Sequence, residues 1–349
     1  MSRLQAACKD ERCRWHGLRL LAADKTTLTL PESRSLFKRF GAHQGSRGLG
    51  PIAVELCCLF DLVSRAPVRF VYNKVCTSEH KLIGKLINSL KKADLLLLDS
   101  GFYYCATFRK ILRRRAHFLI PAKENMRPQV VHTLANGDYL CQILDYSTKT
   151  TLTVRVVFVY RNGFRRRRLI TSLLDSTAFP ASELARLYHM RWDIETFYRD
   201  FKQTLRATSW HCCTPASFQK ELLVHMIVLC LIRLAMLEAS RLALVSVGKL
   251  SFARALTETR LFFNLLLIAV DVLLWPSIWQ VLVHCCARHR VQCKPGRHFS
   301  RDKQQYRRKS RGLERRPRGR KPKSAGNESA SLLKPEALKD LKGKVYLLS

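Results

Sequence analysis

Four side chains carry potential chemistry at helical spacing: Tyr188, Arg191, Glu195 and Lys202. At 100° per residue, their positions fall within roughly 60° of one another around a helix. Residues 181–207 contain no glycine or proline, which predicts one uninterrupted helix. A carboxylate can bind a hard metal ion, and arginine and lysine can bind phosphate oxygens. The alternative is a solvated helix face on which Arg191 and Glu195 form an i, i+4 ion pair.

The pattern Tyr-x2-Arg-x3-Glu-x6-Lys resembles the catalytic helix of the type-four insertion-sequence transposases. That family consists of DDE recombinases with a ribonuclease-H-like fold. Trp192 follows the arginine, as it does in the members that form hairpins. The resemblance implies that Tyr188, Arg191 and Lys202 contact DNA phosphates, which position DNA without reading its sequence. Trp192 could stack on a base flipped from the duplex end, and an aromatic packed into the core is the alternative.

Two aspartates at the ends of apolar runs could complete a set of three acids. The run Ala23-Asp24-Lys25-Thr-Thr-Leu-Thr-Leu-Pro31 resembles the first-acid motif of the family, with Lys25 in place of the usual glycine. The run Leu98-Asp99-Ser100-Gly-Phe-Tyr103 resembles the second-acid motif, with Ser100 in place of the usual arginine. Asp61 competes for the role of first acid, and Asp99 could instead form a turn.

Hydrolysis of a phosphodiester requires an activated nucleophile and neutralisation of the charge on the scissile phosphate. Two metal ions held by converging carboxylates can do both. Asp24, Asp99 and Glu195 are therefore the predicted catalytic and metal-binding residues, with two Mg²⁺ ions as cofactors and Mn²⁺ as a possible substitute. In a ribonuclease-H-like sheet the first acid lies on the first strand, the second just past the neighbouring fourth strand, and the third on a helix.

The chain reads as an α/β protein: a ribonuclease-H-like mixed sheet flanked by helices, with a β-rich insertion before the catalytic helix and a basic disordered tail. We predict a strand, tight turn and strand over residues 17–31, and a mobile loop over 32–51. Further strands are predicted over 52–63, 68–72, 95–99 and 117–121, and helices over 78–92 and 103–115. The predicted division is an N-terminal remnant (1–16), the first part of the core (17–125), the β insertion (126–178), the catalytic and C-terminal helices (179–290) and the tail (291–349).

The net charge of +36 indicates a polyanionic partner, and nucleic acid is the usual one. Residues 294–323 hold fourteen Lys or Arg and two acids, so we expect this segment to be disordered until it binds a polyanion. Arg318 and Arg320 resemble a minor-groove hook, with a non-specific phosphate-binding tail as the alternative. Arg165 and Arg166 begin a basic run that suits a DNA backbone, or a solvated loop.

The predicted partners are transposon-end and target DNA, with a homodimer on DNA and no membrane. The apolar segments 222–236 and 261–283 contain polar or charged residues and favour buried helices over membrane spans. Without an apolar run at the N-terminus, the 13 cysteines predict reduced thiols in the cytoplasm, near the nucleoid.

The predicted function is transposition of a bacterial insertion sequence. The alternatives are a catalytically inactive DNA-binding remnant, or a ribonuclease-H-like nuclease without strand transfer. Only 23 residues precede Asp24, whereas family members normally carry a helical end-binding domain there, which favours the remnant. The three acids and the complete Tyr-Arg-Glu-Lys set favour the transposase.

Overall fold

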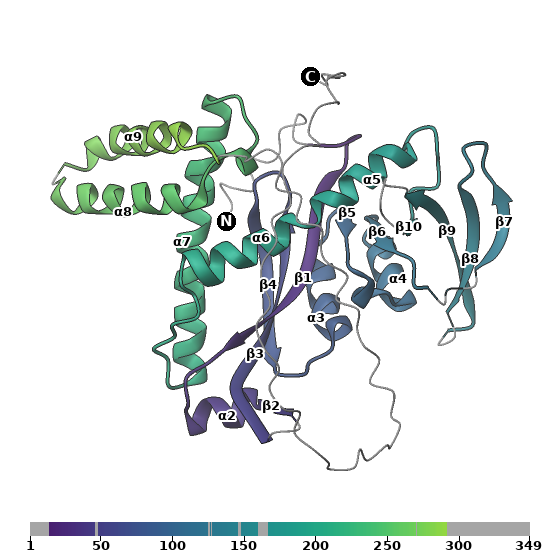
Figure 1. Cartoon of the computed structure of the whole chain (residues 1–349), viewed down its shortest axis with the longest axis horizontal. Helices are drawn as coiled ribbons and strands as arrows, with labels where there is room; N and C mark the ends of the chain where they lie inside the picture. The colour runs from purple at the N-terminus through teal and green to yellow at the C-terminus, as the bar shows by residue number, and fades with distance from the viewer. Residues whose placement is uncertain are drawn as a thin grey trace, which may run out of the picture. The chain divides into compact units, whose positions relative to one another are not determined.

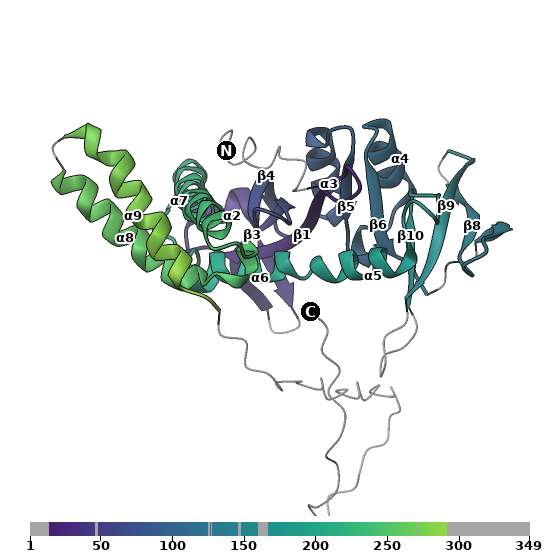
Figure 2. The ribbon, with the colours of Figure 1, turned by 90° about the horizontal axis from the view of Figure 1, so that it is seen from above.

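A single mixed sheet organises this protein, and helices pack against both of its faces (Figures 1 and 2). The computed structural model describes residues 14–291 except 46–47, 125, 127, 146–147, 160–166 and 270. The strands are β1 (Arg19–Thr29), β2 (Ala42–Gly45), β3 (Gly48–Asp61), β4 (Ala66–Lys74), β5 (Asp94–Leu97), β6 (His117–Pro121), β7 (Gln129–Thr133), β8 (Tyr139–Asp145), β9 (Thr150–Val159) and β10 (Arg167–Thr171).

Strand β1 lies in the interior of the sheet and has different partners on its two sides. It pairs antiparallel with β3 and parallel with β5. Beyond β3 lies β4, also antiparallel, and beyond β5 lies β6, which is parallel to β5. Strands β10, β9, β8 and β7 continue the sheet from β6, each antiparallel to the one before. The β-rich residues between 126 and 178 therefore extend the central sheet.

The helices divide between the two faces of the sheet (Figure 2). They are α2 (Arg34–Phe40), α3 (Glu79–Leu86), α4 (Cys105–Arg113), α5 (Ala181–Met190), α6 (Asp193–Arg199), α7 (Pro215–Leu242), α8 (Phe252–Ile268) and α9 (Trp275–Arg288). Phe108 of α4 packs with Ala23 in one buried cluster, whereas Phe197 of α6 packs with Ala22 in the other. Because successive strand residues point to opposite faces, β1 contributes to both cores.

Two predictions near the N-terminus are wrong. Residues 17–31 do not form a hairpin, because β1 runs without a turn and pairs with β3 as far as Thr29. Its centre lacks the glycine or asparagine that a tight turn favours. Residues 32–51 are not a loop, since they contain α2, β2 and the start of β3. Leu36 and Phe40, four residues apart, are almost fully buried and anchor α2.

The predicted uninterrupted helix over 181–207 is also wrong. Helix α5 ends at Met190, and i→i+3 hydrogen bonds such as Trp192 N–H to His189 O (3.3 Å) tighten the chain before α6 begins. After α6, residues Asp200–Thr204 form a π-helical turn. Neither a glycine nor a proline marks these irregularities. Such turns depend on tertiary contacts as well as on local propensity.

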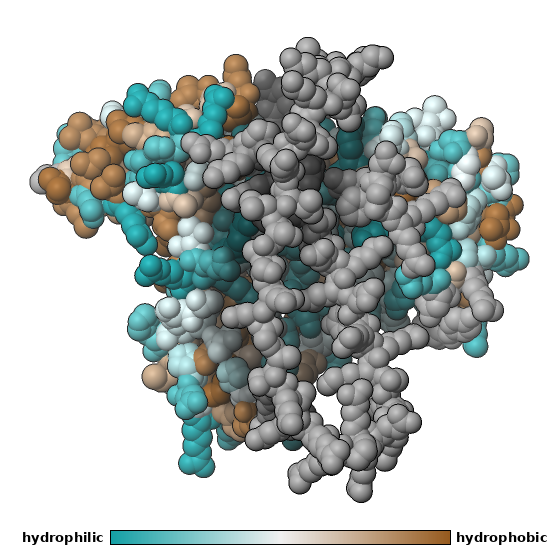
Figure 3. All heavy atoms as spheres, viewed as in Figure 1, coloured by the Kyte–Doolittle hydropathy of each residue, from teal (hydrophilic) through white to brown (hydrophobic). Residues whose placement is uncertain are grey.

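The C-terminal helices differ in burial. By length and composition α7 could cross a membrane, but more than half of its most apolar window is buried within the protein, which also describes a core helix. The prediction of one buried helix over 261–283 is wrong, because this stretch spans parts of α8 and α9. Apolar side chains there are exposed, including Leu267 (86%) and Leu273 (83%), and brown atoms mark this region in Figure 3. The composition of a segment does not show which of its apolar side chains pack against the rest of the protein.

Candidate active site

The registers of β1 and β5 bring the two predicted aspartates to the same level of the sheet. The parallel pairing of these strands runs from Arg19 opposite Asp94 to Ala22 opposite Leu97. Asp24 and Asp99 each lie two residues beyond that last pair. Neighbouring strands are about 4.8 Å apart, so the end of β5 brings Asp99 close to Asp24 on β1, and the two charges act on each other. Asp99 also accepts a hydrogen bond from the backbone N–H of Ser100 (2.5 Å).

Arg191 joins the first aspartate to the predicted third acid. Its Nη1 lies 3.9 Å from Asp24 Oδ2, and its Nη2 donates to Glu195 Oε1 over 3.2 Å. The i, i+4 ion pair considered from the sequence is therefore present. However, this arginine side chain is only 6% exposed, so it is not part of a solvated face. Glu195 is more open to solvent, with 43% of its side chain exposed.

A tyrosine that the sequence analysis did not select fixes α6 on β1. The hydroxyl of Tyr198 donates to the carbonyl oxygen of Asp24 (2.6 Å) and accepts from the backbone N–H of Cys58 on β3 (3.2 Å). The side chain is buried, so both bonds are shielded from water. Tyr198 lies three residues after Glu195, close to the same helix face, and this spacing was the available signal.

The charges of the three acids and Arg191 act on one another. Partial burial raises the pKa of Asp24 to about 6, while the backbone N–H of Lys25 and the charge of Arg191 oppose the rise, and Asp99 and Glu195 add to it. Burial alone would lower the pKa of Arg191, but nearby Tyr188 and the three acids raise it overall. Asp24, Asp99, Glu195 and Arg191 therefore form one electrostatic cluster drawn from β1, the segment after β5, α6 and the link between α5 and α6.

The chemistry of these donors fits a hard divalent cation, because all three are carboxylates. The raised pKa of Asp24 indicates that additional positive charge would stabilise the cluster. As placed, no three His, Cys, Asp or Glu side chains in the described part of the chain are grouped to hold a metal ion. The Arg191 guanidinium contacts both Asp24 and Glu195 instead. A bound cation would have to replace part of that contact.

The predicted DNA-binding residues differ in accessibility. Tyr188 is half-buried, and burial raises its pKa to about 12. Trp192 is 36% exposed, so it is not a core aromatic, and Arg191 lies 5.6 Å from its ring centre. Lys202 Nζ donates to the carbonyl oxygen of Thr27 on β1 over 2.7 Å. Arg165, Arg166, Arg318 and Arg320 lie outside the described residues.

Two further acids are explained by structural contacts. Asp61 is 2% exposed, pairs with Arg19 (2.8 Å) and accepts from the backbone N–H of Ser64 (2.9 Å). These contacts make it a structural residue and remove it as the competing first acid. Glu55 on β3 is also buried, and its Oε2 lies 3.8 Å from Lys25 Nζ. Lys25 is the residue that replaces the usual glycine of the first-acid motif.

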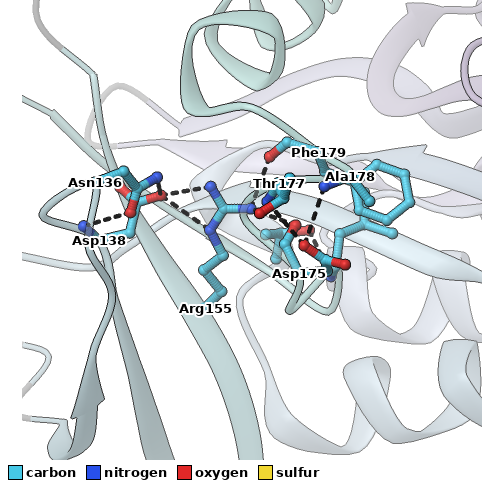
Figure 4. Close-up of polar contacts among 9 residues, drawn as sticks. Asn136, Asp138, Arg155, Asp175, Thr177, Ala178 and Phe179 are labelled. Atoms are coloured by element: carbon cyan, nitrogen blue, oxygen red, sulfur yellow. Dashed lines mark hydrogen bonds and ion pairs between the residues drawn. The ribbon is translucent and has the colours of Figure 1, made fainter.

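A buried arginine holds the segment that leads into α5 (Figure 4). Arg155 on β9 is fully buried, and its Nε donates to Asp138 Oδ2 over 2.9 Å. Its Nη1 donates to the carbonyl oxygens of Asp175 (3.1 Å) and Phe179 (2.7 Å). These two residues lie just before α5, so the outer strands position the start of the helical segment that carries Glu195. Sequence reasoning missed Arg155, because a lone arginine in a strand carries no local signal.

Comparison with known proteins adds independent information. Residues 15–231 match a protein family described as a transposase DDE domain. The chain is 29% identical over 205 residues to the transposase InsG of insertion sequence element IS4 from Escherichia coli K12, covering 55% of this chain and 46% of that protein. It is 23% identical over 170 residues to a probable transposase of element IS5377 from Geobacillus stearothermophilus, covering 46% and 44%. The chain thus spans about half the length of these relatives.

A solved piggyBac transposase synaptic complex with hairpin DNA shows a distant structural similarity. Its TM-score is 0.40 with 12% sequence identity, over 84% of this chain and 64% of that one. Similarity at this level carries no argument about this protein.

Proposed function

Because the chain belongs to the transposase DDE domain family, we propose that it is a DNA transposase of a bacterial insertion sequence. The observation that carries the proposal is that the Arg191 guanidinium pairs with Asp24 and Glu195 and also lies within the electrostatic influence of Asp99, so that three acids from separate elements act on one cation. A remnant without selection for cleavage has no need to keep such a cluster, which favours the active enzyme over an inactive DNA-binding protein. The resemblance inferred from Tyr188, Arg191, Glu195 and Lys202 is confirmed at the level of the family.

We propose a ribonuclease-H-like core for this chain. Three antiparallel strands, β1, β3 and β4, are followed by β5 and β6, which run parallel to β1, in the spatial order β4-β3-β1-β5-β6. This arrangement supports the predicted site, with Asp24 on the first strand, Asp99 past the neighbouring parallel strand and Glu195 on a packed helix. The domain boundaries predicted from the sequence remain proposals.

The chemistry proposed for the site is metal-dependent cleavage of DNA followed by strand transfer. Bound divalent metal ions, Mg²⁺ in our proposal, would activate the attacking oxygen and stabilise charge on the scissile phosphate. Asp24, Asp99 and Glu195 would hold them. Arg191, buried beside these acids, would turn towards a phosphate oxygen once it is released from Asp24.

The residues around the acids would position the DNA. Tyr188 and Lys202 would contact the phosphates of the transferred strand, and the exposed ring of Trp192 would stack on an unpaired base. The charge of +36 supports DNA as the partner, through phosphate contacts. A homodimer on DNA and a cytoplasmic, nucleoid-associated location complete the proposal.

Removal of the third carboxylate tests the proposal. Glu195→Gln keeps the size of the side chain but removes charge that holds a hard cation. We expect cleavage of end-containing DNA in Mg²⁺ to fall at least a hundredfold, while DNA affinity changes little. Glu258→Gln is the matched control, because Glu258 contacts His289 and is not part of the acid cluster.

Three results would separate the alternatives. Equal cleavage by the wild-type protein and Glu195→Gln would mean that Glu195 is structural. Cleavage without joining of pre-cut ends would identify a nuclease without strand transfer. Tight DNA binding by a wild-type protein that neither cleaves nor joins would identify the inactive remnant.

A further inference from the structure

Helix α6 is held by ion pairs on the side opposite the candidate active site. Asp193 pairs with Arg65 in the turn between β3 and β4, and Asp200 pairs with Arg233 of α7, whose Nη2 lies 2.7 Å from Asp200 Oδ2. The two aspartates are seven residues apart, which places them about 20° from each other around a helix. Glu195 lies about 160° from Asp193. The paired aspartates therefore face away from the acid cluster.

The Asp200–Arg233 pair belongs to the protein core. The Arg233 side chain is 3% exposed, and its guanidinium lies 4.5 Å from the ring centre of Phe252 on α8. Burial lowers the pKa of Arg233 to about 10, so it still carries its charge at neutral pH. The charges of Arg65 and Asp193 also act on Arg233, which links the two pairs in one network.

The Arg65 guanidinium of the Asp193–Arg65 pair packs against a glycine, Gly248. A Cβ at Gly248 would lie 2.6 Å from Cζ of Arg65, a contact that no real Cβ makes. The φ angle of Gly248 is not positive, so backbone conformation does not require a glycine here. The space that the Arg65 side chain occupies does favour one. Gly248 thus leaves room for the Arg65 guanidinium beside α6. Both partners of this pair are accessible enough to substitute, with 20% and 23% of their side chains exposed.

We propose that the two ion pairs, Asp193–Arg65 and Asp200–Arg233, fix the rotation of α6 and so position Glu195 towards Asp24. The Tyr198 hydroxyl holds α6 on β1 at one point, and two anchors two turns apart on another face add resistance to rotation about the helix axis. The ends of side chains lie about 5–6 Å from the axis, so a 10° rotation displaces a carboxylate by about 1 Å. Functional groups must be held to within about 0.5 Å, and a 1 Å error can reduce a rate about a hundredfold. The inference rests on the proposed function.

The partly exposed Asp193–Arg65 pair offers variants that separate positioning from electrostatics. Asp193→Asn removes a negative charge near the acids, whereas Arg65→Gln removes a positive one. A purely electrostatic role predicts opposite changes in cleavage rate and in the Mg²⁺ concentration for half-maximal rate. Positioning predicts changes in the same direction: a rate lowered ten- to a hundredfold and a raised Mg²⁺ requirement, with DNA affinity within about twofold of wild type. The double variant should be no worse than either single one, because both substitutions remove the same interaction.

Gly248→Ala provides a second test, since it displaces the Arg65 side chain without changing any charge. We expect it to reproduce the loss of rate in Arg65→Gln, and Glu258→Gln to serve again as the control. Opposite effects of the two charge variants would overturn the proposal. So would a lowered melting temperature with an unchanged rate and Mg²⁺ requirement.

A crystal structure of the double variant gives a readout that does not depend on activity. If Glu195 keeps its position relative to Asp24 on β1 without the ion pair, the proposal is wrong, whatever the cleavage data show. A displaced Glu195 would support it. If the wild-type protein does not cleave DNA, the proposed function is wrong, but this inference is not. The position of Glu195 in the double variant still tests the inference.

Discussion

Asp24→Asn should stabilise the metal-free protein at neutral pH while abolishing its proposed activity. The Asp24 side chain is 21% exposed, and burial raises its pKa from 3.8 to about 6. Below pH 3.8 the carboxyl group is protonated in both the folded and the unfolded chain, and the shift has no cost. Between about pH 3.8 and 6 the unfolded chain has released this proton while the folded chain still holds it, so stability is lost across this window, and the loss is complete once the buried carboxyl group ionises above pH 6. Asparagine stays neutral throughout.

The magnitude follows from the pKa shift. At 1.36 kcal/mol per pKa unit, the shift from 3.8 to about 6 amounts to about 3 kcal/mol above pH 7. Because only part of the titration is complete at pH 5, the difference there should be about 1.5 kcal/mol. The advantage of Asp24→Asn over wild type should therefore grow between pH 5 and pH 7.

Urea unfolding in the presence of a chelator, at several pH values, measures this difference. Added Mg²⁺ should then stabilise the wild-type protein more than the variant, because a ligand that binds only the folded state raises its stability by mass action. A variant that is less stable than wild type at pH 7, or a difference that does not change with pH, would refute the reasoning. The first result would mean that the Arg191 contact outweighs the cost of burial.

Two further predictions concern the sheet and the tail. Arg155→Met leaves the Asp138 carboxylate buried without its cation and should cost about 3–5 kcal/mol in urea unfolding, whereas Arg155→Met combined with Asp138→Leu should recover much of that loss. A single variant within 1 kcal/mol of wild type would contradict this. Deletion of all residues after Cys293 should reduce the slope of log K against log salt for DNA binding, by about 0.9 for each DNA phosphate that the tail neutralises. An unchanged slope would mean that DNA affinity comes from elsewhere in the chain.

Local sequence was sufficient to predict the candidate acids and most elements that carry them. The apolar run before Asp99 predicts a strand buried on both faces, and β5 is such a strand. The strands predicted over residues 52–63, 68–72 and 117–121 are confirmed as β3, β4 and β6. These patterns succeed because hydrophobic periodicity is a local property of the chain. The spacing around Glu195 also predicted helix correctly, except for the break between α5 and α6 and the π-helical turn after α6.

The contacts that organise the site depend on residues distant in sequence. Tyr198 bonds to the backbone of Asp24, Lys202 to Thr27, and Arg233 to Asp200, across 174, 175 and 33 residues respectively. No local pattern encodes such partners, because each depends on how the helices pack on the sheet. Sequence spacing predicted which side chains share a helix face, and tertiary packing decided that Arg191 lies buried between two acids. An unpaired buried charge costs several kcal/mol, roughly, so the buried Arg191 guanidinium is stable only where carboxylates lie beside it. This cost makes the placement of Arg191 specific.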